Sequence, residues 1–128
     1  MNNFKFGAIS TLRMKGLKPQ LIKLLEMMLS VTPVDFGIAF NGGFRTAEQQ
    51  NEIYRTKAGA TTKDGFIKKS AHQSGVAVDL LPYINGKVDI SEKHYDTLRI
   101  VFEKCAKDLN LKTKPVISWD KNHFEIIN

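Results

Sequence analysis

Residues 70–81 have the sequence SAHQSGVAVDLL, in which Gly75 separates a polar half from an apolar half. The apolar half has the length and the valine content of a largely buried strand. Asp79 lies within it, and a buried carboxylate needs either a cationic side chain or a metal ion, because burying an unpaired charge is very costly. The strand by itself favours a salt bridge over a metal ion.

His72 precedes Asp79 on the other side of the glycine. An isolated histidine is more often structural or at the surface than a metal ligand. Histidine and aspartate together, however, are good zinc ligands, and Gly75 allows the sharp turn that would bring His72 to face Asp79. The pair therefore makes a metal site the stronger hypothesis.

Residues 119–126, with the sequence WDKNHFEI, supply further candidates. On a strand, His123 shares a face with Glu125 and opposes its apolar neighbours. Two histidines and one carboxylate would leave the fourth zinc position open to water, as in catalytic sites. Asp120 is the candidate general base that deprotonates this water, with Glu125 as the alternative. For Glu125 we favour orientation of a ligand histidine.

Arg45 follows the turn Gly42-Gly43 and precedes a predicted helix. Its planar guanidinium suits a polarised carbonyl oxygen or a substrate carboxylate, and pairing with Glu48 is an equal alternative. Motifs of other hydrolases and of nucleotide-binding proteins are absent: there is no HExxH, no GxSxG, no phosphate-binding loop and no CxxC. Cys105 continues an apolar helical series and is expected to be a buried structural thiol, whereas His94 is expected to be exposed.

The 128 residues are enough for one domain, residues 1–128, and 42% of them are hydrophobic. No apolar run is long enough to span a bilayer, and residues 1–10 lack the apolar core of a secretion signal. We therefore expect a protein that is cytoplasmic on synthesis, has no stable membrane association and is a monomer.

The net charge of +6 favours anionic partners such as nucleic acid or the cell wall. The lysines are scattered along the chain and do not form a stripe with interleaved aromatic residues. This distribution argues against a nucleic-acid partner.

Hydrophobic periodicity and turn residues predict alternating helices and strands. A helix is expected from Pro19 to about Thr32, a second from Thr46 and a third from Ser91 to about Asn110. Gln49 lies at capping-box spacing from Thr46, and Ile53 and Tyr54 are expected to supply the apolar contact of the second helix. Strands and loops are expected at 34–40 (strand), 57–70 (loop), 76–81 (strand), 83–88 (hairpin), 116–119 (strand) and 123–127 (strand). The order predicts an α+β fold, a mostly antiparallel sheet flanked by helices, with the zinc site at the sheet.

The pattern Ser70-x-His72-x-x-Gly75-x-Ala77-x-Asp79, followed by Asp120-x-x-His123-Phe-Glu, resembles the zinc peptidases of bacterial peptidoglycan. These include the D-alanyl-D-alanine carboxypeptidases and the L-alanyl-D-glutamate endopeptidases of phage lysis cassettes. Residues 34–38 and 43–50 resemble the phage endolysin branch in particular. The resemblance covers residues 6–126.

The resemblance implies that His72, Asp79 and His123 bind Zn²⁺ and that Asp120 is the general base. It further implies that Arg45 contacts the substrate or the oxyanion and that Ser70 lies at the site. Many relatives carry glutamate in place of Asp120, and no separate wall-binding domain is recognisable in this chain.

The predicted function is cleavage of peptidoglycan stem peptides, with L-alanyl-D-glutamate endopeptidase activity favoured by the phage-like N-terminal half. The alternatives are a D-alanyl-D-alanine carboxypeptidase and a zinc-containing wall-binding module without activity. As a lysis enzyme, the protein would need a membrane-permeabilising partner for release and would act on the wall afterwards.

Overall fold

The computed structural model describes residues 2–57 and 59–127. It contains four helices and five strands within this part of the chain. In chain order they are α1 (Ala8–Arg13), α2 (Pro19–Val31), β1 (Asp35–Ile38), α3 (Ala47–Thr56), β2 (Ala77–Ile84), β3 (Lys87–Val88), α4 (Glu92–Asp108), β4 (Lys112–Thr113) and β5 (His123–Ile127). None of the helices in the described ranges has the length and apolarity that crossing a membrane requires.

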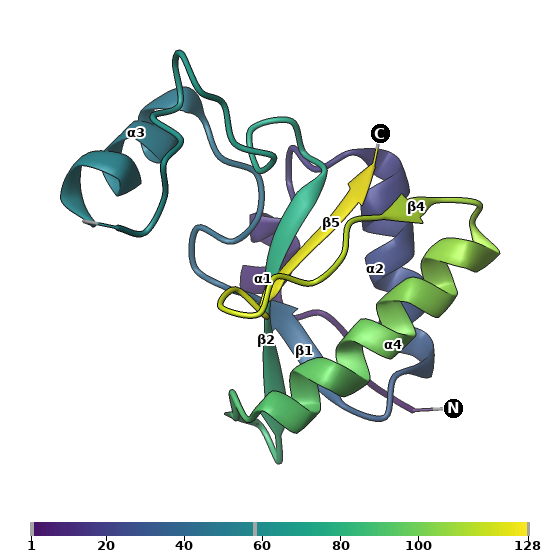
Figure 1. Cartoon of the computed structure of the whole chain (residues 1–128). Coiled ribbons are helices and arrows are strands. Elements are labelled where there is room, and N and C mark those ends of the chain that lie inside the picture. Colours follow the sequence, from purple (N-terminus) through teal and green to yellow (C-terminus); the bar gives the residue numbers. More distant parts are fainter. Residues whose placement is uncertain (1, 58, 128) are drawn as a thin grey trace.

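The strands form one sheet in the order β1-β2-β5-β4, and every neighbouring pair is antiparallel (Figure 1). β3 pairs with the distal end of β2 through the predicted hairpin, whose turn residues Asn85 and Gly86 both have positive φ. Such angles suit a two-residue hairpin turn and are the reason for asparagine and glycine there. The predicted α+β class and antiparallel sheet are confirmed.

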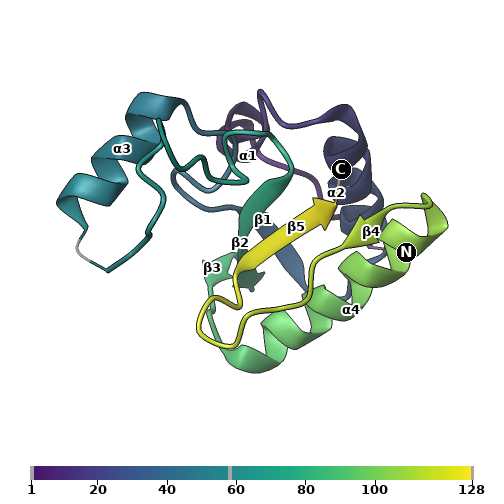
Figure 2. The same cartoon turned by 45° about the horizontal axis from the view of Figure 1, so that its top comes forward.

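One face of the sheet carries the hydrophobic core, which α2 and α4 complete (Figure 2). In β2 and β5 alternate residues point into this core, because side chains of a strand alternate between faces. The helices contribute apolar stripes at helical spacing. The fully buried members of the core are Leu21, Leu24, Leu25, Met28, Ile38, Val78, Leu80, Leu98, Phe102 and Phe124. The opposite face of β2 and β5 is therefore free for polar side chains.

α3 and the loop that follows it lie to one side of the sheet, apart from α2 and α4 (Figures 1 and 2). Thr46 caps α3 in the predicted capping box with Gln49. The predicted apolar contact through Ile53 and Tyr54 is wrong for Tyr54, whose side chain is exposed. The buried residue of α3 is instead a polar one, Gln50.

The predicted strand at 116–119 is wrong, because this segment is an exposed loop and turn. On the side of β5 away from β2, the neighbouring strand is β4, which ends immediately before Lys114 and Pro115. Proline has no N–H to donate to a sheet, so the chain leaves the sheet there. α1 has no counterpart among the elements predicted from the sequence.

Two predictions about side chains outside the site have different outcomes. Cys105 is buried in α4, as expected. His94 is not an exposed histidine: its side chain is 12% exposed and its Nε2 lies 3.3 Å from a carboxylate oxygen of Asp89. The turn before α4 folds back onto the helix, which the sequence pattern did not indicate.

Candidate metal centre

Asp79 and His123 are brought together by the register of the central strand pair. They lie directly opposite each other in β2 and β5. The hydrogen bonds from Leu80 N–H to Asn122 O and from Ile126 N–H to Val76 O flank them. Asp79 and His123 thus form a non-hydrogen-bonded pair, the type in which facing side chains are closest. Both side chains project from the face of the sheet opposite the core.

His72 comes from the turn at 70–75 that leads into β2. Ser70 Oγ accepts a hydrogen bond from the His72 backbone N–H at 3.1 Å, which fixes the start of the turn. Gly75 has a φ of 71°, a conformation that favours glycine, and a Cβ there would lie 2.8 Å from the carbonyl oxygen of Gly16. The turn therefore directs His72, which is almost fully buried, toward Asp79.

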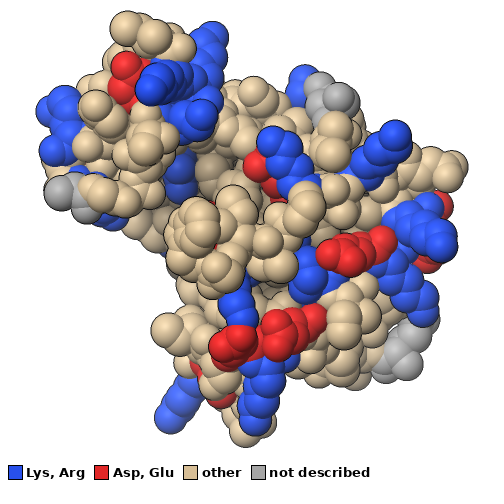
Figure 3. Space-filling model, viewed as in Figure 1, with Lys and Arg blue, Asp and Glu red and all other residues tan. Residues whose placement is uncertain are grey.

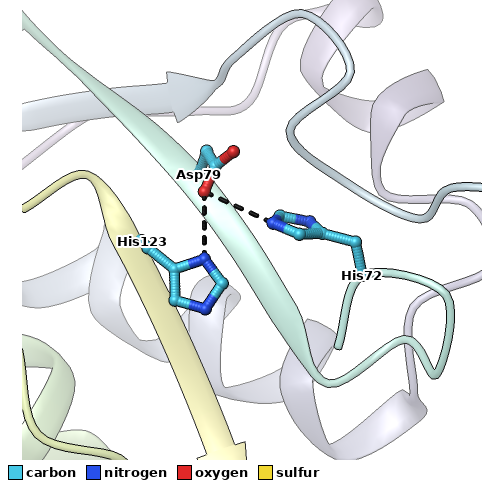
Figure 4. A group of neighbouring side chains, drawn as sticks. All are labelled: His72, Asp79 and His123. Carbon is cyan, nitrogen blue, oxygen red and sulfur yellow. Dashed lines mark ion pairs between the residues drawn. The ribbon is translucent and has the colours of Figure 1, made fainter. Parts of the chain in front are cut away.

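The hydrogen bonds of the two histidines determine which ring nitrogens carry protons. In each ring one nitrogen faces Asp79 (Figure 4), and the other nitrogen is bound elsewhere. His72 Nδ1 donates to the carbonyl oxygen of Gly43 at 3.0 Å, and His123 Nε2 donates to Glu125 Oε1 at 2.8 Å. Both acceptors lack a proton to give, so in the neutral rings His72 Nε2 and His123 Nδ1 carry lone pairs. Both of these nitrogens face the same carboxylate oxygen, Asp79 Oδ1. Three electron-pair donors converge on one point, an arrangement that a cation stabilises.

The distances within this group fit a tetrahedral metal ion. Asp79 Oδ1 lies 3.5 Å from His72 Nε2 and 3.3 Å from His123 Nδ1. A tetrahedral zinc with ligand bonds of about 2.0–2.1 Å has edges of roughly 3.3–3.4 Å between ligand atoms. All three ligand atoms lie within 4.8 Å of one another. The second nitrogen of each histidine is held by an acceptor, as is usual for metal-binding histidines.

The pKa values of Asp79 and His123 show how strongly these side chains interact. Burial raises the pKa of the Asp79 carboxyl, but the hydrogen bonds and charge of His123 and His72 outweigh burial and hold this pKa well below its usual range. Burial lowers the pKa of His123, but Asp79 and Glu125 outweigh it and raise the pKa above the usual histidine value. Asp79 is therefore a carboxylate at neutral pH, the form that binds metal.

Arg45 contacts the second carboxylate oxygen of Asp79. Its Nη2 lies 3.3 Å from Asp79 Oδ2, its Nη1 donates to Gln50 Oε1 and its Nε donates to the carbonyl oxygen of Asn41. No ion pair between Arg45 and Glu48 is present among the residues that the structure describes. The guanidinium is thus oriented at the site, and it leaves Asp79 Oδ1 to the histidines.

Glu125 and Asp120 are in different situations. Glu125 uses Oε1 to accept from His123 and Oε2 to pair with Lys114 Nζ at 3.1 Å. The Asp120 carboxylate makes no hydrogen bond or ion pair within residues 2–57 and 59–127. Burial lowers the pKa of Arg45, and the negative charges of Asp79 and Asp120 oppose this shift. Asp120 also adds to the charges that raise the pKa of His123. Of the two acids, Asp120 is the one whose carboxylate is available to a water molecule.

A cavity of about 420 Å³ opens over this group. Its lining includes every residue singled out from the sequence as a site residue: Arg45, Ser70, His72, Asp79, Asp120, His123 and Glu125. The remainder of the wall is contributed by α3 and the loop after it, by Ala71 and by Lys114. The seven predicted positions, which come from four separate parts of the chain, therefore surround one cavity.

Comparison with known proteins shows the family of this chain. The family model of the phage L-alanyl-D-glutamate peptidases matches residues 2–125. A protein of Escherichia phage T5, named L-alanyl-D-glutamate peptidase, is 34% identical over 97% of this chain and 90% of its own length. The chain belongs to the phage L-alanyl-D-glutamate peptidase family.

A solved structure resembles this member of the phage peptidase family over nearly its whole length. The L-Ala D-Glu endopeptidase ChiX of Serratia marcescens has a TM-score of 0.80, with 96% of this chain and 90% of ChiX covered. Sequence identity is 22%, so this match bears on the fold. The fold and the family thus agree with the resemblance inferred from the motif.

Gln50 is a buried residue of this cavity that chemical reasoning from the sequence did not single out. Its side chain is fully buried, accepts from Arg45 and donates to the carbonyl oxygen of Lys63 at 3.0 Å. It therefore links the arginine to the loop after α3. The sequence feature that could have indicated this role is a polar residue one turn into a short helix with few apolar residues.

Arg99 is a second residue without a predicted role. Its Nη2 donates to the carbonyl oxygen of His123 at 2.7 Å, and its guanidinium lies 3.9 Å from the centre of the Phe124 ring. These contacts hold the first residues of β5 from the α4 side. The signal in the sequence was an arginine within the apolar stripe of α4, between Tyr95 and Phe102.

Proposed function

We propose that this protein is a zinc-dependent endopeptidase that hydrolyses the bond between L-alanine and D-glutamate in peptidoglycan stem peptides. The observation that carries the proposal is the convergence of His72 Nε2, Asp79 Oδ1 and His123 Nδ1 on one point at the floor of a cavity. Zinc is the metal that best suits two imidazoles and one carboxylate at tetrahedral spacing. Three protein ligands leave a position for the reaction.

When bound, zinc supplies a Lewis acid that polarises the scissile carbonyl and acidifies the attacking water. We propose that Asp120 accepts the proton of this water and then transfers it to the leaving amine of the glutamyl residue. Its carboxylate has no other partner among the described residues and lines the same cavity as His72 and His123. A general base needs such a position within hydrogen-bond reach of the water.

Arg45 and Glu125 have supporting parts in this proposal. Arg45 holds Asp79 through Oδ2, and its remaining N–H groups can stabilise negative charge that develops on the carbonyl oxygen. Glu125 holds the His123 ring through Nε2, which keeps Nδ1 directed at Asp79. Ser70 fixes the turn that carries His72.

Two alternatives use the same fold. A D-alanyl-D-alanine carboxypeptidase could employ all of these residues, and the family match and the name of the phage T5 relative favour the endopeptidase. A wall-binding module without activity would have no need for a base, whereas Asp120 lines the cavity and its carboxylate has no partner in the part of the chain that the structure describes. We therefore place the endopeptidase first.

Digestion of purified peptidoglycan tests this function. We expect fragments with a new N-terminus at D-glutamate and glycan strands that end their stems at L-alanine. Mass spectrometry of the products identifies the bond directly. Release of free D-alanine without a new glutamyl N-terminus would instead support the carboxypeptidase, and intact stems after prolonged digestion would support the binding module.

We further propose that the enzyme acts in host lysis and reaches the wall through a separate membrane-permeabilising protein. The membership in a phage peptidase family supports this role. Expression of the chain alone in a bacterial host should leave the culture turbid, and co-expression with a pore-forming protein should clear it. The control is His123→Ala with the same pore. Equal clearing by that variant would contradict the proposal.

A further inference from the structure

The cavity over the metal centre contains more positive charge than the proposed chemistry uses. Four cationic side chains line it: Arg45, Lys63, Lys69 and Lys114. Arg45 is paired with Asp79, and Lys114 is paired with Glu125. The amines of Lys63 and Lys69 have no hydrogen-bond or ion-pair partner anywhere in the described part of the chain.

These two lysines belong to the loop at 59–69, which lies beside α3 (Figure 1) and contributes to the wall of the cavity. Figure 3 shows lysine and arginine side chains on the surface over α3 and this loop, next to a hollow between that part and the rest of the molecule. The loop backbone is anchored at both lysines. Gln50 binds the carbonyl oxygen of Lys63, and Lys69 immediately precedes the buried Ser70.

The turn between the lysines is also ordered by hydrogen bonds. One carboxylate oxygen of Asp64 accepts the backbone N–H groups of Phe66, Ile67 and Lys68. These bonds lower the pKa of the Asp64 carboxyl, so it is ionised at neutral pH. The backbone at Lys63 and Lys69 is therefore fixed by hydrogen bonds. The two lysine side chains can change conformation within the cavity that also contains the metal centre.

The substrate of the proposed reaction has a matching charge. A glutamyl residue has two carboxyl groups, of which one continues the stem peptide and the other remains free. Both are carried by the residue whose nitrogen is released, so the free carboxylate lies close to the scissile bond. The cavity also contains the acidic side chains Asp120 and Glu125, which would repel that carboxylate unless nearby cations compensated.

We propose that Lys63 and Lys69 bind the free carboxylate of the glutamyl residue and make the enzyme selective for stems that carry a carboxylate there over stems that carry a carboxamide. The inference rests on the proposed function and deepens it, because it names the chemical class of stem that is cleaved. Charge-assisted hydrogen bonds from an amine to a carboxylate are stronger than those to a neutral amide. The loop after α3 is thus the specificity-determining wall of the site.

The test uses two synthetic stem peptides that contain L-alanyl-D-glutamate and differ only in this group, carboxylate or carboxamide. Wild-type enzyme should cleave the carboxylate peptide with a kcat/KM at least about ten-fold higher. Lys63→Gln and Lys69→Gln should each lower kcat/KM for the carboxylate peptide, and the double variant should abolish the preference. The rate on the carboxamide peptide should change little in all three variants.

The matched control is Lys68→Gln, which removes the same charge from the same loop at a side chain that does not line the cavity. It should keep the wild-type preference. Zinc content and circular dichroism of each variant distinguish loss of selectivity from damage to the metal centre or the fold.

Different results contradict the lysine proposal and the proposed function. If the wild-type enzyme cleaves both peptides equally well and the double variant leaves their ratio unchanged, the lysine proposal is wrong and the endopeptidase remains. If the wild-type enzyme with full zinc cleaves neither peptide at the L-alanyl-D-glutamate bond, both proposals are wrong.

Discussion

Replacement of His123 with alanine is expected to remove the metal and to lower the activity at least about 1,000-fold. Wild-type protein should contain close to one zinc per chain. The variant loses one of three donors and also the ring that links Asp79 to Glu125. Lewis-acid catalysis contributes several kcal/mol to hydrolysis, which corresponds to a rate loss of this size. Elemental analysis and peptidoglycan digestion measure the two effects.

The same loss is expected for His72→Ala and Asp79→Ala, since each removes a donor from the same point. The matched control is His94→Ala, which deletes a histidine and its contact with Asp89 away from the cavity. This variant should keep both zinc and activity. Full zinc occupancy in any of the three ligand variants would show that the metal is bound elsewhere.

Asp120→Asn is expected to separate metal binding from catalysis. The variant should keep zinc and fold but lose about 100-fold or more of kcat, the usual contribution of a general base. Because asparagine has nearly the same shape, the loss reflects the missing proton acceptor. Added zinc should not restore activity, since the metal centre is intact.

Glu125→Gln is the informative comparison for Asp120→Asn. The amide oxygen of glutamine can still accept from His123 Nε2, but more weakly, so zinc affinity should fall by about 10–100-fold, as for other residues that orient metal ligands. Activity should therefore return when zinc is added in excess. The opposite result would be a Glu125→Gln enzyme that is inactive with full zinc and an Asp120→Asn enzyme that is fully active. It would show that Glu125 is the general base and that Asp120 is not.

The features that the sequence predicted well are those that depend on neighbouring residues. The capping box at Thr46 and the hairpin turn at Asn85-Gly86 have local causes, and both are present. Asp79 was identifiable because a carboxylate within an apolar strand requires a partner. The convergence with His72 was suggested by the glycine between them, whose positive φ forms the turn.

The features that the sequence did not predict depend on distant parts of the chain. The family motif implied that Asp79 and His123 share a metal ion, but no local pattern gives their pairing across two strands, because a strand register is set by the whole sheet. The contact of Gln50 with Arg45 requires the position of α3 relative to β2. The segment 116–119 has the apolar residues of a strand, but β4 takes the place beside β5. Apolar composition alone does not distinguish an exposed loop from a strand.

One measurement tests the central claim most directly: digestion of peptidoglycan by metal-depleted protein, before and after addition of one equivalent of zinc, with the products identified by mass spectrometry. The proposed function predicts no new fragments from the depleted protein and, after zinc is restored, fragments that begin at D-glutamate. Fragments of that kind from the fully depleted protein would contradict the zinc-dependent mechanism. Cleavage at a different bond after zinc addition would contradict the proposed substrate specificity.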